Sequence, residues 1–256
     1  MNAFNELASR QLRDYDSRSP GLMFAEEITL SLEEAYTLQK MVAGLRRERG
    51  ETHIGYKVGC TSPAIRTQLG IDHSVAGHLW ESERRDSGCS LKLTNFDNPA
   101  IEGELAIELA NDLQVDALSD ADIESAIGCV FPVIELHHAI FRGKRPSDSE
   151  LIANNAIHAG FVTGSSRTEF RQLNSATLSI LIDGTIVDAY EGSELTGGVI
   201  RSVRWLAAHL ARNGGQLHAG DTILTGSLPQ LIPVTTDADV RIETSHYGNV
   251  AAQFVG

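Results

Sequence analysis

The spacing of apolar residues changes along the chain, and its first part has the period of helices. In residues 5–16 and 31–50, apolar side chains recur every three to four positions, which predicts two amphipathic helices. Ser31, followed three residues later by Glu34, is the signature of a capping box at the start of the second helix. Residues 17–30 carry neither signal, so we expect a loop between the two helices.

The rest of the chain consists mainly of short apolar runs between turn residues, which is typical of strands. Residues 53–61 predict a first short strand. Residues 177–190 predict a hairpin in which Asp183 and Gly184 form the tight turn. A clear helical period returns at residues 202–215, where a Gly-Gly pair predicts the end of the helix.

Helices at the start and mostly strands afterwards favour an α+β fold over a regular alternation of strands and helices. We therefore predict a largely helical N-terminal part at residues 1–52 and a strand-rich core at residues 53–256. The chain has 256 residues, of which 42% are hydrophobic, and this is enough apolar material for a substantial core.

Charge and cysteine content exclude several classes of protein. The net charge is −13, which argues against a nucleic-acid partner because phosphate binding needs clustered Lys and Arg. No run approaches the roughly 18 apolar residues of a membrane span, and the N-terminus lacks a signal-peptide core. Cys60, Cys89 and Cys129 are widely spaced and lack a CxxC pattern. We therefore expect a soluble protein of the reducing cytoplasm, without a membrane or nucleic-acid partner.

Three glutamates stand in apolar surroundings. Glu102 and Glu104 flank Gly103, and in a strand their side chains leave the same face. Glu135 lies in a later apolar run, and a helix capped by Ser119 fits between the two runs. A solvated strand face is the ordinary explanation of such acids, but the apolar neighbours argue against it. Three buried carboxylates repel one another unless a cation holds them, and an all-oxygen site suits Mg²⁺ or Mn²⁺.

Two further side chains accompany the acids. His137 comes two positions after Glu135, so it shares that face in a strand, where a packed or supporting histidine is more usual than a metal ligand. Lys57 lies between Gly55 and Gly59 near the first strand. A lysine whose stem follows a strand end is the ordinary reading of that position.

The order of these segments resembles a known family. "GYKVGCTS", "GHL", "PAIEGELAIELANDL", "VFPVIEL", "NNAIHAGFVTG" and "LHAGDTILTGSLPQLIPV" are similar to the 2-keto-4-pentenoate hydratase and 4-oxalocrotonate decarboxylase family of the fumarylacetoacetate hydrolase superfamily. The resemblance implies a mixed β-roll core like the fumarylacetoacetase C-terminal domain, a smaller N-terminal part and a homo-oligomer. It also implies that the acids bind Mg²⁺ or Mn²⁺, which chelates a small 2-keto or 2-hydroxy-dienoate acid from aromatic catabolism.

The resemblance also assigns roles to individual residues. It carries metal binding onto Glu102, Glu104 and Glu135. Lys57 matches the active-site lysine of the family, while Thr225 and Ser227 match a loop close to the substrate.

The acid-base residues of the hydratases are not retained. Val75 falls where they carry an acid, and Ile157 falls where they carry a serine. Neither side chain can transfer a proton. His158, next to the serine position, is our first candidate for a replacement, and Asp72 is the second.

Three functions therefore stay open. The first is a metal-dependent hydratase of a 2-keto-enoate. The second is a decarboxylase of the 4-oxalocrotonate type, or a C–C hydrolase of an acylpyruvate, on the same metal platform. The third is a divergent member with an unassigned reaction, or a non-catalytic, metal-holding subunit that only supports a partner enzyme.

Overall fold

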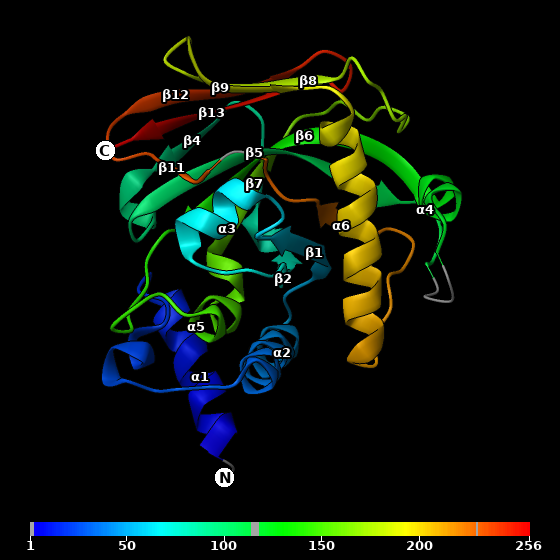
Figure 1. The fold of residues 1–256 in the computed structure, drawn as a ribbon. Helices are drawn as coiled ribbons and strands as arrows, with labels where there is room; N and C mark the ends of the chain where they lie inside the picture. The colour runs from blue at the N-terminus through cyan, green and yellow to red at the C-terminus, as the bar shows by residue number, and fades with distance from the viewer. Residues whose placement is uncertain (1–2, 114–117, 229) are drawn as a thin grey trace.

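The computed structural model describes residues 3–113, 118–228 and 230–256. Figure 1 shows three regions: the N-terminal helices at one end, two sheets at the other, and the long helix α6 along one side. The helices are α1 Ala3–Asp16, η1 Leu22–Glu26, α2 Leu32–Glu48, α3 Pro63–Leu69, η2 Glu81–Glu83, η3 Leu93–Asn95, α4 Asp120–Ala126, α5 Asp148–Ala153, η4 Asn155–Ile157 and α6 Ser193–Arg212.

The strands form two sheets. The larger sheet has the order β2-β1-β10-β5-β6-β7-β3, with β11 paired to β5, and the smaller has the order β4-β13-β12-β8-β9. The strands are β1 His53–Gly59, β2 Val75–Trp80, β3 Arg84–Asp86, β4 Cys89–Lys92, β5 Pro99–Leu109, β6 Ile127–His138, β7 His158–Thr163, β8 Thr177–Ile182, β9 Thr185–Glu191, β10 Thr222–Leu224, β11 Ile232–Pro233, β12 Ala238–Thr244 and β13 Asn249–Val255.

The main hydrophobic cluster includes side chains from both sheets and from α6. Gly103 on β5 sets how closely the sheets approach. A Cβ atom at Gly103 would lie 2.6 Å from Cδ1 of Ile242 on β12 and 2.9 Å from Cγ1 of Ile180 on β8. Because side chains alternate along a strand, Glu102 and Glu104 point away from that interface. Gly103 therefore allows the two sheets to pack closely, while its two acidic neighbours lie on the opposite face of β5.

The N-terminal helices share a second hydrophobic cluster with later parts of the chain. Met23 and Leu38 pack there with Ile65 of α3 and with Leu151 and Ile152 of α5. Figure 1 shows α1, α2 and α5 side by side at that end of the molecule. The division at residue 52 stays a prediction, and the helices before it are packed against residues that belong to the strand-rich part.

Several local predictions are confirmed. Ser31 and Glu34 form a complete capping box, as Ser119 forms one with Asp122 at the start of α4. Asp183 has a φ of 49° and Gly184 a φ of 77°, and both lie in the turn between β8 and β9. These positive angles are those of a primed hairpin turn.

The predicted helix 202–215 begins earlier than the sequence indicates, at Ser193. The sequence does not indicate the first turns of this helix, because Gly197 and Gly198 interrupt the helical pattern there. The α+β fold predicted from the sequence is confirmed. In the described part of the chain, none of the helices has the length and apolarity of a membrane span.

Candidate metal centre and active site

Strands β5 and β6 bring two of the three predicted acids together. Glu102 pairs directly with Glu135 in the antiparallel register of the two strands. Both side chains are buried, with 5% of Glu102 and none of Glu135 exposed. Two adjacent carboxylates in such surroundings repel each other strongly, so the structure must supply positive charge nearby.

His137 completes a compact group with these two acids. One ligand atom from each of Glu102, Glu135 and His137 lies within 4.8 Å of the other two. Nε2 of His137 is 3.2 Å from Oε2 of Glu102 and 3.7 Å from Oε2 of Glu135. The sequence predicts His137 on this face and favours a packed or supporting role for it.

Glu104 lies beside this group and is held from the other side by the loop after β10. Its Oε2 accepts a hydrogen bond from the backbone N–H of Gly226, while its Oε1 is buried without a partner among the described residues. Burial raises the pKa of Glu104 well above its usual range, and the charges of Glu135 and Glu102 raise it further. Glu104 is thus adjacent to, but not part of, the group of three with mutually close ligand atoms.

Lys57 supplies the positive charge. Its Nζ lies 3.2 Å from Oε1 of Glu135, and only 2% of the residue is exposed. Burial lowers the pKa of Lys57, but the charges of Glu135, Glu102 and Glu104 outweigh burial and raise the pKa overall. Conversely, burial raises the pKa of Glu135, and Lys57 and the neighbouring histidines overcome this and lower it. Lys57 therefore stays a cation, and Glu135 next to it stays an anion.

His158 reaches the same carboxylate from β7. Its Nδ1 lies 2.6 Å from Oε1 of Glu135, and its Nε2 lies 3.9 Å from Oε2 of Glu83. Glu83 in turn accepts a hydrogen bond from the hydroxyl of Tyr15 and is paired with Arg46, both from the N-terminal helices. His158 thus links Glu135 to a buried polar network.

The backbone next to His158 has an unusual conformation. Asn155, Ala156 and Ile157 have φ angles of 54°, 52° and 53°, which form a left-handed turn. Each such non-glycine residue costs about 1–2 kcal/mol, so surrounding contacts must hold the turn. Asn155 accepts a hydrogen bond from the N–H of His78 and donates one to its carbonyl. The turn presents the Ala156 carbonyl to Nζ of Lys57 at 3.4 Å, and no sequence signal pointed to it.

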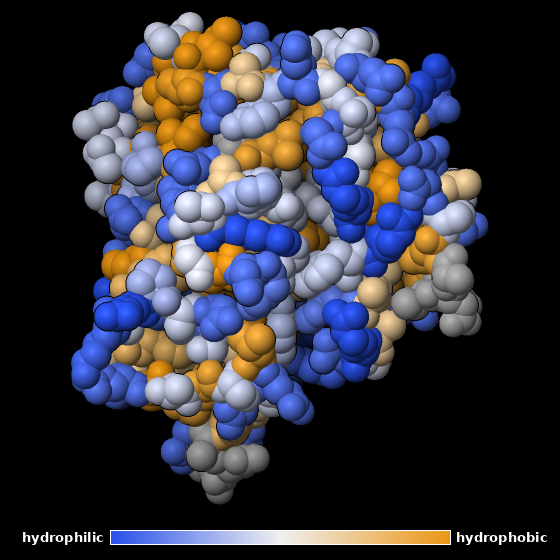
Figure 2. Space-filling view, in the orientation of Figure 1, coloured by the Kyte–Doolittle hydropathy of each residue, from blue (hydrophilic) through white to orange (hydrophobic). Residues whose placement is uncertain are grey.

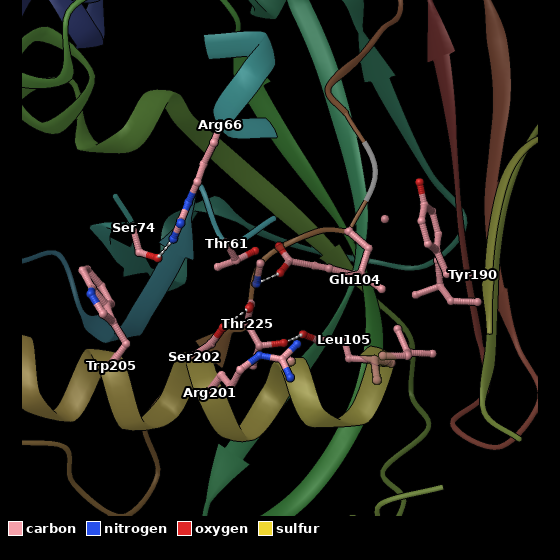
Figure 3. A pocket seen from close by; sticks show the side chains of 16 residues that line it. Thr61, Arg66, Ser74, Glu104, Leu105, Tyr190, Arg201, Ser202, Trp205 and Thr225 are labelled. Atoms are coloured by element: carbon pink, nitrogen blue, oxygen red, sulfur yellow. Dashed lines mark hydrogen bonds between the residues drawn. The ribbon is translucent and has the colours of Figure 1, made fainter. Parts of the chain in front are cut away.

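Two cavities border the acids. A small one of about 20 Å³ is lined by Lys57, Glu102 and His137 together with the two apolar replacements, Val75 and Ile157. A larger one of about 240 Å³ lies between α6, β8 and the loop after β10, and Figure 3 shows Glu104 at its wall. The two cavities lie next to different members of the acidic cluster.

The remaining predicted site residues are not all in the cluster. Hydroxyls of Thr225 and Ser227 donate to the backbone carbonyls of Leu105 and Gly103, which fixes their loop against β5. Asp72 is exposed and, among the described residues, is absent from the linings of both cavities. The structure therefore brings together Glu102, Glu104, Glu135, Lys57 and His158, and it leaves Asp72 outside.

The donor set fits a divalent metal ion. Oε1 of Glu104, Oε2 of Glu135 and both ring nitrogens of His137 are buried and lack hydrogen-bond partners within the described ranges. A buried polar atom without a partner costs about 1–3 kcal/mol. Carboxylate oxygens are the usual ligands of Mg²⁺ and Mn²⁺, and a cation would satisfy these atoms together.

Comparison with known proteins gives the class and then the family. No family model matches the chain. In a solved structure, 4-oxalocrotonate decarboxylase from Pseudomonas putida G7, complexed with magnesium and adipate, has a TM-score of 0.89 at 23% identity and covers 98% of this chain and 97% of its own. The fold is thus the one seen in such structures, which include a putative fumarylacetoacetate hydrolase family protein from Yersinia pestis CO92 with a TM-score of 0.55, as the resemblance implied.

Two curated relatives show the family to which the chain belongs. A 2-keto-4-pentenoate hydratase of Burkholderia vietnamiensis is 31% identical over 222 residues, which are 86% of this chain and 85% of that relative. A 4-oxalocrotonate decarboxylase of Pseudomonas putida is 25% identical over 252 residues, which are 98% of this chain and 92% of that relative. The chain belongs to the 2-keto-4-pentenoate hydratase family, and the prediction of an enzyme of the lyase class is confirmed.

Proposed function

We propose that this protein is a divalent-metal-dependent lyase that hydrates a small 2-keto or 2-hydroxy-dienoate acid of aromatic catabolism. The observation that carries the proposal is the burial of Glu102, Glu104 and Glu135 beside Lys57, with carboxylate oxygens that have no partner among the described residues. In this proposal the three acids hold Mg²⁺ or Mn²⁺. When bound, such an ion would polarise the 2-oxo group of a keto acid and favour its enolate form.

The side chains around the acids have separate roles in this proposal. Lys57 keeps its proton next to Glu135 and donates a hydrogen bond to an anionic substrate oxygen. His158 holds Oε1 of Glu135 from β7, which limits the rotation of that carboxylate. Thr225 and Ser227 keep the N–H of Gly226 aimed at Glu104 by bonding the backbone of β5.

A decarboxylase is the second candidate, and one observation favours it. Val75 and Ile157 line the small cavity next to Lys57, so two apolar side chains occupy the positions of the hydratase acid and serine. Water must be activated and a proton delivered for hydration, whereas loss of CO₂ needs mainly stabilisation of the enolate. The absence of a proton-transferring side chain at these two positions suits the second reaction better.

The test is turnover of a small panel of keto acids by the purified protein with Mg²⁺ or Mn²⁺. Loss of the ultraviolet absorbance of the dienol without release of CO₂ is expected for the hydratase, and CO₂ release would move the decarboxylase to first place. Glu102→Ala should abolish either activity. Failure to turn over any member of the panel, with metal bound, would support the divergent, partner-supporting alternative.

We also propose a homo-oligomer. Ile186 and Val187 on the edge strand β9 are 60% and 47% exposed. Figure 2 shows apolar side chains gathered at the upper left, over the part where Figure 1 draws β9 and β12. A subunit interface would cover such side chains. Light scattering should give a mass above the 27.7 kDa of one chain.

A further inference from the structure

His137 has the geometry of a ligand rather than of a packed histidine. We infer that His137 binds the metal ion together with the acids, and that the site consequently prefers first-row transition ions such as Mn²⁺ over Mg²⁺. The inference rests on the proposed metal-dependent function and adds to it a nitrogen ligand and a preferred class of metal ion.

The ring of His137 is fully enclosed and faces the two acids. Only 1% of the residue is exposed, and Nε2 lies 3.2 Å from Glu102 and 3.7 Å from Glu135. A supporting histidine would donate a hydrogen bond to one of these carboxylates. Yet neither ring nitrogen makes one to any residue that the structure describes. Nε2 therefore lies close to both acids without a hydrogen bond to either, as expected of an atom that binds the same metal ion as they do.

The three residues are also fixed relative to one another. Glu135 and His137 are two positions apart on β6, so they share one face, and Glu102 is the direct partner of Glu135 on β5. Strands in the middle of a sheet are rigid supports for a site. His137 further lines the small cavity beside Lys57, which places the ring next to space for about one water molecule.

A nitrogen donor changes which metal the site prefers. Mg²⁺ binds oxygen ligands and retains water, whereas imidazole suits first-row transition ions. Three carboxylates alone would serve Mg²⁺ well. Glu102, Glu135 and His137 would hold such an ion with one nitrogen donor beside their carboxylate oxygens, and Glu104 lies next to them.

Pulsed electron paramagnetic resonance on the Mn²⁺-loaded full chain tests ligation directly, because a bound imidazole nitrogen gives a ¹⁴N coupling and a carboxylate oxygen does not. We expect this coupling in the wild type, its loss in His137→Gln and its retention in His158→Gln, the matched control for the other histidine near Glu135. Growth with ¹⁵N-histidine should convert the coupling to that of ¹⁵N, and this measurement needs no substitution that could disturb folding.

The affinities of Mn²⁺ and Mg²⁺, measured by calorimetry, test the preference. His137→Gln should lower the ratio of Mn²⁺ to Mg²⁺ affinity by about tenfold or more, the usual scale for altering a metal site. A Mn²⁺ complex without histidine coupling, or a ratio unchanged in His137→Gln, would overturn the inference while keeping the metal enzyme. Absence of any Mn²⁺ or Mg²⁺ binding by the wild type would overturn both the inference and the proposed function.

Discussion

The ammonium group of Lys57 lies 3.2 Å from Oε1 of Glu135, although β10 and β5 separate their strands in the sheet. Both residues are buried, and each holds the other in its charged form. A buried ion pair contributes little net stability by itself, but loss of one partner leaves an isolated charge in the interior. The pair therefore keeps one carboxylate of the cluster ionised.

Lys57→Met should reduce turnover by on the order of 10² or more, the usual effect of removing a positioned acid-base or electrostatic group. Without metal, it should also lower the free energy of unfolding by about 3–5 kcal/mol, because Glu135 loses its cation. Added metal should restore part of this stability. Lys40→Met, at an exposed position on α2, is the control. Unchanged turnover in Lys57→Met would remove Lys57 from the active site.

Gly226→Ala should weaken metal binding and destabilise the fold. Gly226 has a φ of 88°, and an added Cβ would lie 2.4 Å from the side chain of Thr61 and 2.8 Å from the carbonyl of Val58. The loop must shift, so its N–H no longer holds Glu104 in place. We expect a metal affinity lower by about tenfold, as for other residues that orient metal ligands.

Gly220→Ala is the matched control, measured by calorimetry and thermal unfolding. Gly220 has a φ of 87°, but nothing lies within 4 Å of an added Cβ. Both variants carry the backbone strain, and only Gly226→Ala carries the clash. Equal metal affinity in the two variants would contradict a role of the loop in holding Glu104.

Gly103→Ala should cost about 1–3 kcal/mol, the usual range for overpacking a core. The added methyl group meets Cδ1 of Ile242 across the interface between the sheets. Ile242→Val removes that atom, so the double variant should recover part of the stability lost in Gly103→Ala. Urea denaturation of the two single variants and the double variant measures this coupling. Strict additivity of the two changes would mean that the sheets do not pack through Gly103.

A half-buried histidine pair should lower stability in mild acid. Nε2 of His53 lies 3.0 Å from Nδ1 of His78. Burial is the main cause that lowers the pKa of His53 to about 4, and the charges of Arg47 and Arg46 add to it. Burial is also the main cause that lowers the pKa of His78. An unfolded histidine titrates near pH 6.5, so the unfolded state binds more protons as the pH falls below about 6.5.

The sign follows from that difference: the contribution of this pair to stability is constant above about pH 6.5 and decreases below it, by about 1.4 kcal/mol per pH unit for each histidine, down to the folded pKa. The midpoint of urea unfolding, followed from pH 8 to pH 5, measures the decrease. His53→Gln should flatten the slope, while His246→Gln, at an exposed position, should leave it unchanged. Equal slopes in the wild type and in His53→Gln would exclude this pair as a cause.

Local features of the sequence determined much of the fold. Alternation along a strand placed Glu102 and Glu104 on one face, and the capping signatures of Ser31 and Ser119 marked two helix starts correctly. Asp183 and Gly184 marked the hairpin turn. These signals succeed because each depends on interactions within a few residues, which the sequence displays directly.

The tertiary structure alone decided how distant side chains meet. Whether His137 faces the acids or the core, whether His158 reaches Glu135, and whether Asp72 lies near the site all depend on strand register and on loop paths. The left-handed turn at Asn155–Ile157 leaves no local signal, because contacts with another strand hold it against its intrinsic preference. The sequence by itself determines caps, turns and strand alternation, because these depend on neighbouring residues. The convergence of side chains from β1, β5, β6 and β7 depends on how the strands pair in the folded sheet.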